Sequence, residues 1–168
     1  MAIHTIRVHG DPVLRQATVP VGDIDAPLRR LVDDMLETMY DAPGVGLAAN
    51  QVGVQKRMFV WDIGDGAGPG VAVNPSLAGH AGEWTYDEGC LSVPGLFWPI
   101  VRPRRVVLTA TDLDGREFVV DAEDMLARVF LHEVDHLDGH LLLERLDDDQ
   151  RRDAMRRLRT RDLGLPSR

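Results

Sequence analysis

Cysteine is nearly absent from this sequence, which has a single one, Cys90, among its 168 residues. One cysteine cannot form an intramolecular disulfide, so the class of small secreted domains held together by disulfides is excluded. Cys90 must therefore serve as a core residue, a nucleophile or a metal ligand.

Long apolar runs are missing as well. No window approaches the roughly 18 consecutive apolar residues that a membrane-spanning helix requires. The N-terminal segment has no basic stretch followed by an apolar one, as a secretory leader would have. We therefore expect a protein of the cytoplasm that has no membrane partner.

Basic residues are in the minority, with 19 Lys and Arg against 27 Asp and Glu and a net charge of −8. This balance disfavours a protein that binds nucleic acid through a broad basic surface, and we expect no DNA partner. Arginines gather near the C-terminus, at Arg151, Arg152, Arg156, Arg157, Arg159 and Arg161. An exposed, solvated helix face is the simpler explanation, and a transient contact with the ribosome is the alternative.

Strand-like runs separated by Gly, Pro and Asp fill the middle of the chain. They are Met58–Ile63, Val71–Val73, Trp84–Tyr86, Val106–Thr111 and Phe118–Val120, and Asp112–Gly115 is expected to be a hairpin turn. No linker, repeat or low-complexity segment divides the chain. We therefore expect residues 1–168 to form a single domain around one core.

Helical periodicity flanks these strands. Apolar residues at three- and four-residue spacing predict a helix that begins near Asp25 and ends before Pro43 and Gly44. A second helix is predicted over Ala122–Leu137 and a third from about Asp147. This order predicts an α+β fold, in which antiparallel sheets pack around a central second helix and the other two helices lie toward the ends of the chain.

The strongest local signal is the HExxH sequence His132-Glu133-Val134-Asp135-His136, inside the central predicted helix. Residues four apart on a helix face the same way, with about 5–6 Å between their Cβ atoms, so His132 and His136 could meet one metal ion. Glu133 is rotated by about 100° around the helix and could take a proton from water. The pattern also arises by chance on solvated helices.

A catalytic metal site needs a third protein ligand. His140 would lie about 12 Å from His132 along a continuing helix, so one ion could not hold it together with the other two histidines. Glu144 and Cys90 both stay open. We favour Cys90, although a lone cysteine is more often an ordinary core residue.

Three segments resemble the motifs of the peptide deformylases. They are GVGLAANQ at Gly44–Gln51, EGCLS at Glu88–Ser92 and HEVDHLDG at His132–Gly139, and their order and separations also match. The resemblance extends to GDPVLR at Gly10–Arg15 and so covers essentially the whole chain. It implies that Cys90, His132 and His136 are the metal ligands and that a fourth position holds water.

The resemblance also implies the reaction and the metal. The family hydrolyses the formyl group from the N-terminal formyl-methionine of nascent polypeptides and releases formate, so formyl-Met peptides are the expected partners. One thiolate and two imidazoles alone would suggest Zn²⁺. We follow the family and expect one Fe²⁺ per chain in a cytoplasmic monomer, with Zn²⁺, Ni²⁺ or Co²⁺ as substitutes in purified protein.

Roles for individual residues follow from the same resemblance. Glu133 is expected to move the proton from water to the departing amine. The side-chain amide of Gln51 and the backbone N–H of Leu91 are expected to donate to the tetrahedral oxyanion.

Further residues are expected around the substrate and the ligands. The expected substrate contacts are Gly44, Val45, Gly46, Glu88 and Gly89 along the peptide and Tyr86, Met125 and Val129 around the methionine side chain. The two helical residues could equally be ordinary core. We also expect Glu88 to pair with an arginine such as Arg102, and Asp135 to orient a histidine.

Two other classes of protein fit parts of the pattern. A zinc peptidase that cuts ordinary peptide bonds would share HExxH, but no third ligand stands at its customary spacing. A non-catalytic metal domain or ribosome-binding factor would not need Gln51 and Glu133 beside a full ligand set.

Overall fold

The structure is a computed structural model that describes residues 2–162. Within this part of the chain the elements are η1 (Pro12–Arg15), α1 (Ala26–Asp41), β1 (Gly46–Ala48), η2 (Ala49–Val52), β2 (Met58–Trp61), β3 (Gly70–Ala81), β4 (Trp84–Cys90), β5 (Val93–Arg102), β6 (Arg105–Thr111), β7 (Glu117–Glu123), α2 (Asp124–Leu137), η3 (Leu142–Arg145) and α3 (Asp148–Asp162), where η denotes a 3₁₀ helix. The single domain expected over residues 1–168 stays a prediction, and Met1 and residues 163–168 lie outside the described part.

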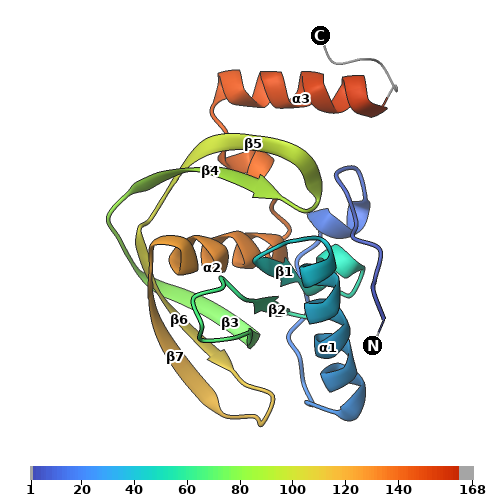
Figure 1. Cartoon of the computed structure of the whole chain (residues 1–168), viewed down its shortest axis with the longest axis vertical. Helices are drawn as coiled ribbons and strands as arrows, with labels where there is room; N and C mark the ends of the chain where they lie inside the picture. The colour runs from blue at the N-terminus through green and yellow to red at the C-terminus, as the bar shows by residue number, and fades with distance from the viewer. Residues whose placement is uncertain (1, 163–168) are drawn as a thin grey trace.

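Two antiparallel sheets lie on either side of α2. The larger sheet has the strand order β1-β2-β3-β6-β7, and β4 pairs with β5 in a separate hairpin. Figure 1 shows α2 crossing the middle of the molecule between them, with α1 beside the large sheet and α3 beyond the hairpin. The predicted α+β fold with a central helix is thereby confirmed.

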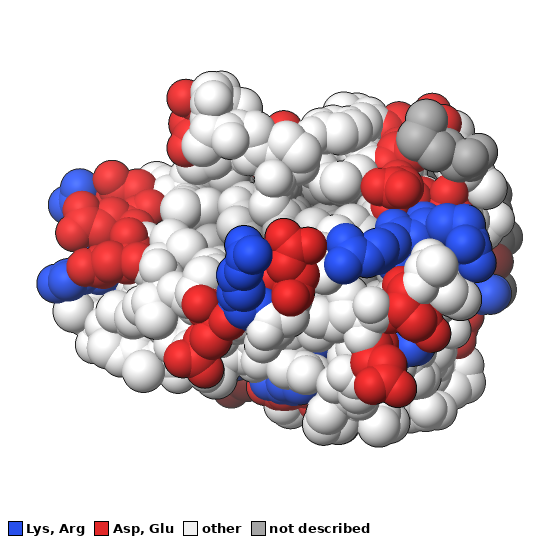
Figure 2. Space-filling view, turned by 90° about the horizontal axis from the view of Figure 1, so that it is seen from below, with Lys and Arg blue, Asp and Glu red and all other residues white. Residues whose placement is uncertain are grey.

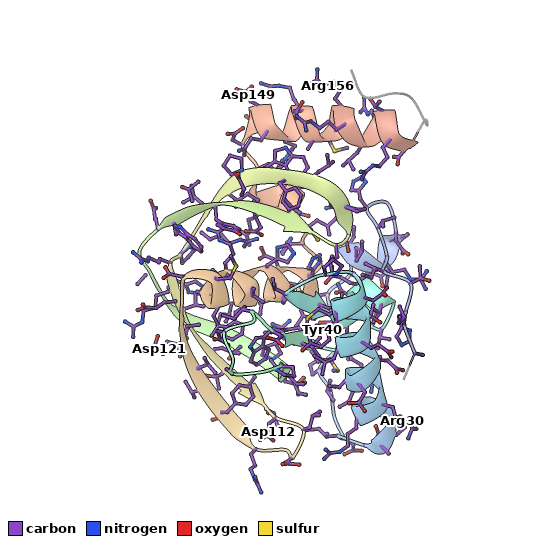
Figure 3. The ribbon with its side chains drawn as sticks, in the orientation of Figure 1. Arg30, Tyr40, Asp112, Asp121, Asp149 and Arg156 are labelled. Carbon is purple, nitrogen blue, oxygen red and sulfur yellow. The ribbon has the colours of Figure 1, made fainter. Side chains whose placement is uncertain are left out.

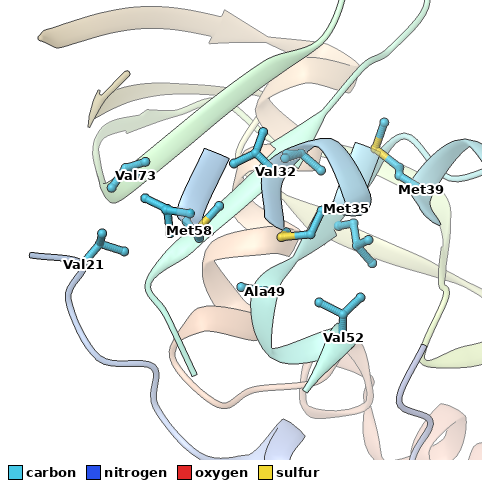
Figure 4. Packing of buried hydrophobic residues seen from close by; sticks show 11 residues of the cluster. Val21, Val32, Met35, Met39, Ala49, Val52, Met58 and Val73 are labelled. Carbon is cyan, nitrogen blue, oxygen red and sulfur yellow. The ribbon is translucent and has the colours of Figure 1, made fainter. Parts of the chain in front are cut away.

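Helix α1 begins and packs as its sequence requires. The side chain of Asp25 accepts a hydrogen bond from the backbone N–H of Leu28 at 2.9 Å and caps the first turn, which also contains Pro27. Its apolar side is buried against β1, β2 and β3, and Figure 4 shows Val32 and Met35 of α1 near Met58 of β2. This packing holds the segment that follows α1 against the large sheet.

The apolar side of α2 faces the large sheet. The Phe130 ring lies with its centroid 5.8 Å from that of Phe59 and 5.0 Å from that of Trp61, within a cluster that also contains Ala127 and Leu137. Because these positions recur every three to four residues, the polar residues between them are turned toward the β4–β5 hairpin. The HExxH residues are directed to this side.

Helix α3 packs on the outer side of the hairpin through a thin apolar stripe. Ala154 and Leu158 are buried with Trp98 and Ile100 of β5. Its arginines are largely exposed, and Arg157 forms a 2.6 Å ion pair with Asp153 of the same helix. Figure 3 shows Asp149 and Arg156 on the outer side of α3, and Figure 2 shows acidic and basic side chains interspersed on another face.

The structure corrects several predicted boundaries. The strands β3 and β4 run well beyond the predicted Val71–Val73 and Trp84–Tyr86, and the central helix begins at Asp124 because Ala122 still pairs with Val106 in the sheet. The hairpin turn is confirmed by the 2.9 Å hydrogen bond from the Asp112 N–H to the Arg116 carbonyl.

Two strands were missed by the sequence analysis. Strand β5 contains Pro94 and Pro99. An edge strand tolerates proline at positions where the missing N–H would have faced away from the neighbouring strand. Strand β1 reads Gly-Leu-Ala, a run with little β propensity. Among residues 2–162, no helix combines the length and the apolar character that a membrane span requires.

Candidate metal centre and substrate pocket

Cys90 and the two HExxH histidines meet where β4 ends against α2. The Cys90 Sγ lies 3.2 Å from the His136 Nε2, which in turn lies 3.2 Å from the His132 Nε2. The three ligand atoms are all within 4.8 Å of one another, and all three side chains are largely buried. A four-coordinate ion about 2.0–2.3 Å from each donor needs separations of roughly 3.5 Å, so the donor set fits a transition metal.

The alternatives for a third ligand point elsewhere. The His140 Nδ1 lies 2.6 Å from a Glu144 carboxylate oxygen, and the other oxygen of Glu144 lies 2.5 Å from Arg15. Both side chains are substantially exposed. Among the described residues, Cys90 is the one that completes the group with His132 and His136.

The two imidazoles have opposite electrostatic environments. Burial disfavours the charged form of both rings, but the neighbouring Cys90 and Glu88 outweigh this effect and raise the pKa of His132 well above its ordinary value. Burial and the charge on His132 hold the pKa of His136 well below its ordinary value. The uncharged form of the His136 ring, which is the form that can bind a metal, is therefore favoured.

Glu88 orients His132. A carboxylate oxygen of Glu88 lies 2.6 Å from the His132 Nδ1, so the Nδ1–H donates to it and Nε2 is the ring atom that faces Cys90 and His136. Arg102 holds the same carboxylate through two hydrogen bonds of 2.7 and 2.8 Å. The predicted pairing of Glu88 with Arg102 is confirmed, and these contacts hold the pKa of Glu88 well below its usual range despite burial.

The expectation that Asp135 orients a histidine was wrong. Its carboxylate accepts hydrogen bonds from Arg102 at 2.8 Å and from Arg145 at 2.5 and 3.0 Å. Asp135 lies between His132 and His136 in the sequence, but its side chain points toward β5 and η3, where the two guanidinium groups lie. The orienting carboxylate comes instead from β4.

Glu133 is buried beside the three ligands. Only 4% of the residue is exposed, and Oε2 of its carboxylate has no hydrogen-bond partner within the described protein. Burial raises the pKa of Glu133 to about 7. A carboxylate with this pKa can both accept and donate a proton near neutral pH.

Gln51 is fixed in one orientation by its neighbours. Its side-chain oxygen accepts from the Ala48 N–H at 2.9 Å, so the amide nitrogen is turned the other way, toward the Ser92 Oγ at 3.1 Å and the Cys90 Sγ at 3.9 Å. Leu91 lies directly after Cys90 in the turn between β4 and β5.

A cavity of about 670 Å³ opens beside these residues. Its lining includes every expected substrate and catalytic residue, namely Gly44, Val45, Gly46, Gln51, Tyr86, Glu88, Gly89, Leu91, Met125, Val129 and Glu133, together with Cys90 and His132. The Glu88 carboxylate is already taken up by its arginine and histidine partners, so Glu88 borders the pocket without offering it a free charge.

Several residues of this region escaped the sequence analysis as site residues. Ile63 and Pro94 line the cavity, and no local pattern marks them because they lie in a loop and in the unpredicted β5. Asn50 donates to the His136 carbonyl at 2.5 Å. Its place inside the GVGLAANQ segment was the available signal.

Comparison with known proteins agrees with this geometry. The family model described as Polypeptide deformylase matches residues 3–152. A peptide deformylase of Acidothermus cellulolyticus is 50% identical over 159 residues, covering 95% of this chain and 87% of that protein, and one of Clostridium botulinum is 51% identical over 145 residues, covering 86% and 97%. The crystal structure of a peptide deformylase from Legionella pneumophila has a TM-score of 0.90 at 42% identity and covers 96% of each chain. With this match over most of its length, the chain belongs to the polypeptide deformylase family.

Proposed function

We propose that this protein hydrolyses N-terminal formyl groups at the centre formed by Cys90, His132 and His136. As a member of its family the chain is a hydrolase that removes the formyl group from nascent polypeptides. The observation that carries the choice of centre is the meeting of three ligand atoms within 4.8 Å beside the Glu133 carboxylate.

Cys90, His132 and His136 would hold one metal ion, for which we propose Fe²⁺, with Zn²⁺, Ni²⁺ or Co²⁺ as substitutes. When bound, the ion supplies a Lewis acid that lowers the pKa of water and polarises the formyl oxygen. The contact between Glu88 and the His132 Nδ1 supports this assignment, since an outer carboxylate commonly fixes a ligating imidazole.

Glu133 would move the proton. Its buried carboxylate, with a pKa of about 7, accepts a proton from the attacking water and then delivers it to the departing amine nitrogen. The products are formate and a free N-terminal amine. Glu133 faces the pocket, and within residues 2–162 its Oε2 has no hydrogen-bond partner, so no ion pair with these residues has to break first.

Gln51 and Leu91 would stabilise the negative charge that develops on the formyl oxygen. The amide of Gln51 is held on the pocket side by the Ala48 N–H and by Ser92, so its orientation is set before substrate binds. We propose that the backbone N–H of Leu91 is the second donor.

The peptide would extend along β1. This strand is at the edge of the large sheet and pairs with β2 on one side only, so its other edge can add a strand. Gly44 and Gly46 let the peptide backbone come close, and we propose that Tyr86, Met125 and Val129 enclose the methionine side chain.

The setting of the reaction is also a proposal. Nascent chains are its substrate, so we propose that the protein acts in the cytoplasm. We also propose that it acts as a monomer. The exposed arginines of α3 support a transient contact with the ribosome.

Formate release from a formyl-Met peptide tests this function. Anaerobically purified protein should release formate, and Glu133→Ala should lose the activity while its measured metal content stays at the wild-type level. Cleavage of unformylated peptides by the wild type, without formate release, would instead indicate a zinc peptidase.

A further inference from the structure

A continuous series of ion pairs connects the protein surface with His132. It begins at Arg145 in η3 and ends at the imidazole through three intermediate side chains. In order, the series is Arg145, Asp135, Arg102, Glu88 and His132. Arg145, the outermost member, belongs to η3, whereas His132, the innermost member, belongs to α2.

The outer half of the series is a forked contact. Arg145 approaches Asp135 with two nitrogens, at 2.5 and 3.0 Å from its two carboxylate oxygens. Arg102 adds a third hydrogen bond to the same carboxylate at 2.8 Å. The Asp135 side chain is thus held by guanidinium groups from η3 and from the end of β5.

The inner half is buried. Arg102, which is 4% exposed, uses its remaining donors on the Glu88 carboxylate, and Glu88 accepts from the His132 Nδ1. Arg128 adds a 2.7 Å hydrogen bond to Glu88 from a neighbouring turn of α2. Nε and Nη2 of Arg102 therefore bind within the hairpin, and Nη1 reaches Asp135 of α2, so the guanidinium group joins the hairpin to the helix.

This bridging matters because the ligands sit on different elements. Cys90 ends β4, whereas His132 and His136 belong to α2, so their separation depends on how the hairpin is held against the helix. Arg102 ties Glu88 of β4 to Asp135 of α2. Arg145 fixes the Asp135 end of that tie.

We propose that Arg145 is a positioning residue for the metal centre. Through Asp135, Arg102 and Glu88 it holds the His132 ring in place and keeps Cys90 at its distance from the two histidines, although it touches neither metal nor substrate. The inference rests on the proposed metal centre and assigns to η3 a part in metal retention.

Arg145 is also the member of the series that can be changed safely. Its side chain is 48% exposed, whereas those of Arg102 and Glu88 are only 4% and 5% exposed, so loss of Arg145 leaves no unpaired charge in the core. Arg151 offers a matched control. It also binds the η3 segment, through the carbonyls of Leu143 and Glu144, but makes no contact with the series.

The test uses full-length protein loaded with Co²⁺. Arg145→Ala, Arg145→Lys and Arg151→Ala are compared with the wild type for the rate of metal release to a chelator, the visible absorption of the bound Co²⁺ and the melting temperature. Arg145→Ala should release metal about three- to tenfold faster, with a shifted absorption band, since loss of an outer-sphere partner typically weakens metal binding. Arg145→Lys should recover only part of the loss, because an ammonium group cannot reproduce the fork.

Arg151→Ala should behave as the wild type in release rate and absorption. Equal release rates for Arg145→Ala and wild type would overturn the inference, as would an equal loss in Arg151→Ala, which would indicate general loosening of η3. None of these readouts depends on deformylation, so failure of formate release leaves the comparison intact. A wild type that binds no Co²⁺ would overturn the metal centre and this inference together.

Discussion

Gly46 leaves the space that the Glu133 carboxylate occupies. A Cβ atom on residue 46 would lie 2.4 Å from the Glu133 Oε1, closer than real Cβ contacts come, and 3.0 Å from the Val129 Cγ1, which is tighter than most. The edge strand β1 and helix α2 therefore approach each other so tightly at this point that any larger residue must displace the Glu133 side chain. The close approach brings the proposed proton carrier next to the strand along which the peptide would lie.

Gly46→Ala should consequently displace the Glu133 carboxylate. We expect kcat/KM for a formyl-Met peptide to fall about 10²-fold, since a displacement near 1 Å at the reacting centre has that effect. Metal content should be unchanged, because the atoms nearest to that Cβ belong to Glu133 and Val129 and not to the proposed ligands. Gly22→Ala is the control, since a Cβ there meets nothing within 4 Å, and it should keep wild-type kinetics.

The raised pKa of Glu133 predicts a pH-dependent effect on stability. The carboxyl has an ordinary pKa of 4.5 and a pKa of about 7 in the fold, so ionisation opposes folding. Below pH 4.5 the group is protonated in both states and costs nothing, and the penalty grows as the pH rises through 7, to roughly 3 kcal/mol. In chelator-treated protein, Glu133→Gln should thus be more stable than wild type at pH 8 and equal to it near pH 4, as measured by urea unfolding. Parallel stability curves for the two proteins would contradict the assignment.

Gln51→Leu removes the proposed side-chain donor at nearly constant volume. Since loss of one oxyanion donor typically costs 10²–10³-fold in kcat, we expect a decrease of about that size with KM little changed. Ser92→Ala, which removes the partner of the Gln51 amide, should cause a smaller decrease. A rise in KM without a change in kcat would move Gln51 to a role in peptide binding.

Val129→Phe should narrow the proposed methionine pocket. Val129 is 4% exposed and lines the cavity beside Glu133, so a larger side chain there takes room from the substrate. We expect KM for a formyl-Met peptide to rise about tenfold or more, and KM for a formyl-Ala peptide to change much less. An equal effect on both peptides would place the methionine side chain elsewhere.

Chelation of the metal should remove activity and lower the melting temperature together. An ion that binds only the folded state stabilises it by mass action, so both properties should return when Fe²⁺ is added back without oxygen. The variant His136→Ala should show the low melting temperature before and after addition of metal.

Local patterns were enough to place side chains around a single helix. The helical period of 3.6 residues places His132 and His136 on one side of α2 and turns Glu133 away from them, whatever the rest of the fold does. The same period identified α1 and its end before Pro43, and a polar turn identified the β6–β7 hairpin. Motif resemblance then supplied Cys90, Gln51 and the reaction.

Apart from the expected pairing of Glu88 with Arg102, the contacts between elements were not obtained from local patterns in the sequence. The sequence by itself determined how His132, Glu133 and His136 are arranged around α2, because this arrangement depends only on the backbone hydrogen bonds of a single helix. Motif resemblance favoured Cys90, but only the tertiary structure shows that Cys90 rather than Glu144 lies beside His132 and His136 and that Glu88 rather than Asp135 contacts the His132 Nδ1. Those choices depend on how the β4–β5 hairpin packs across α2, and such packing arises from burial and charge pairing between residues far apart in the chain.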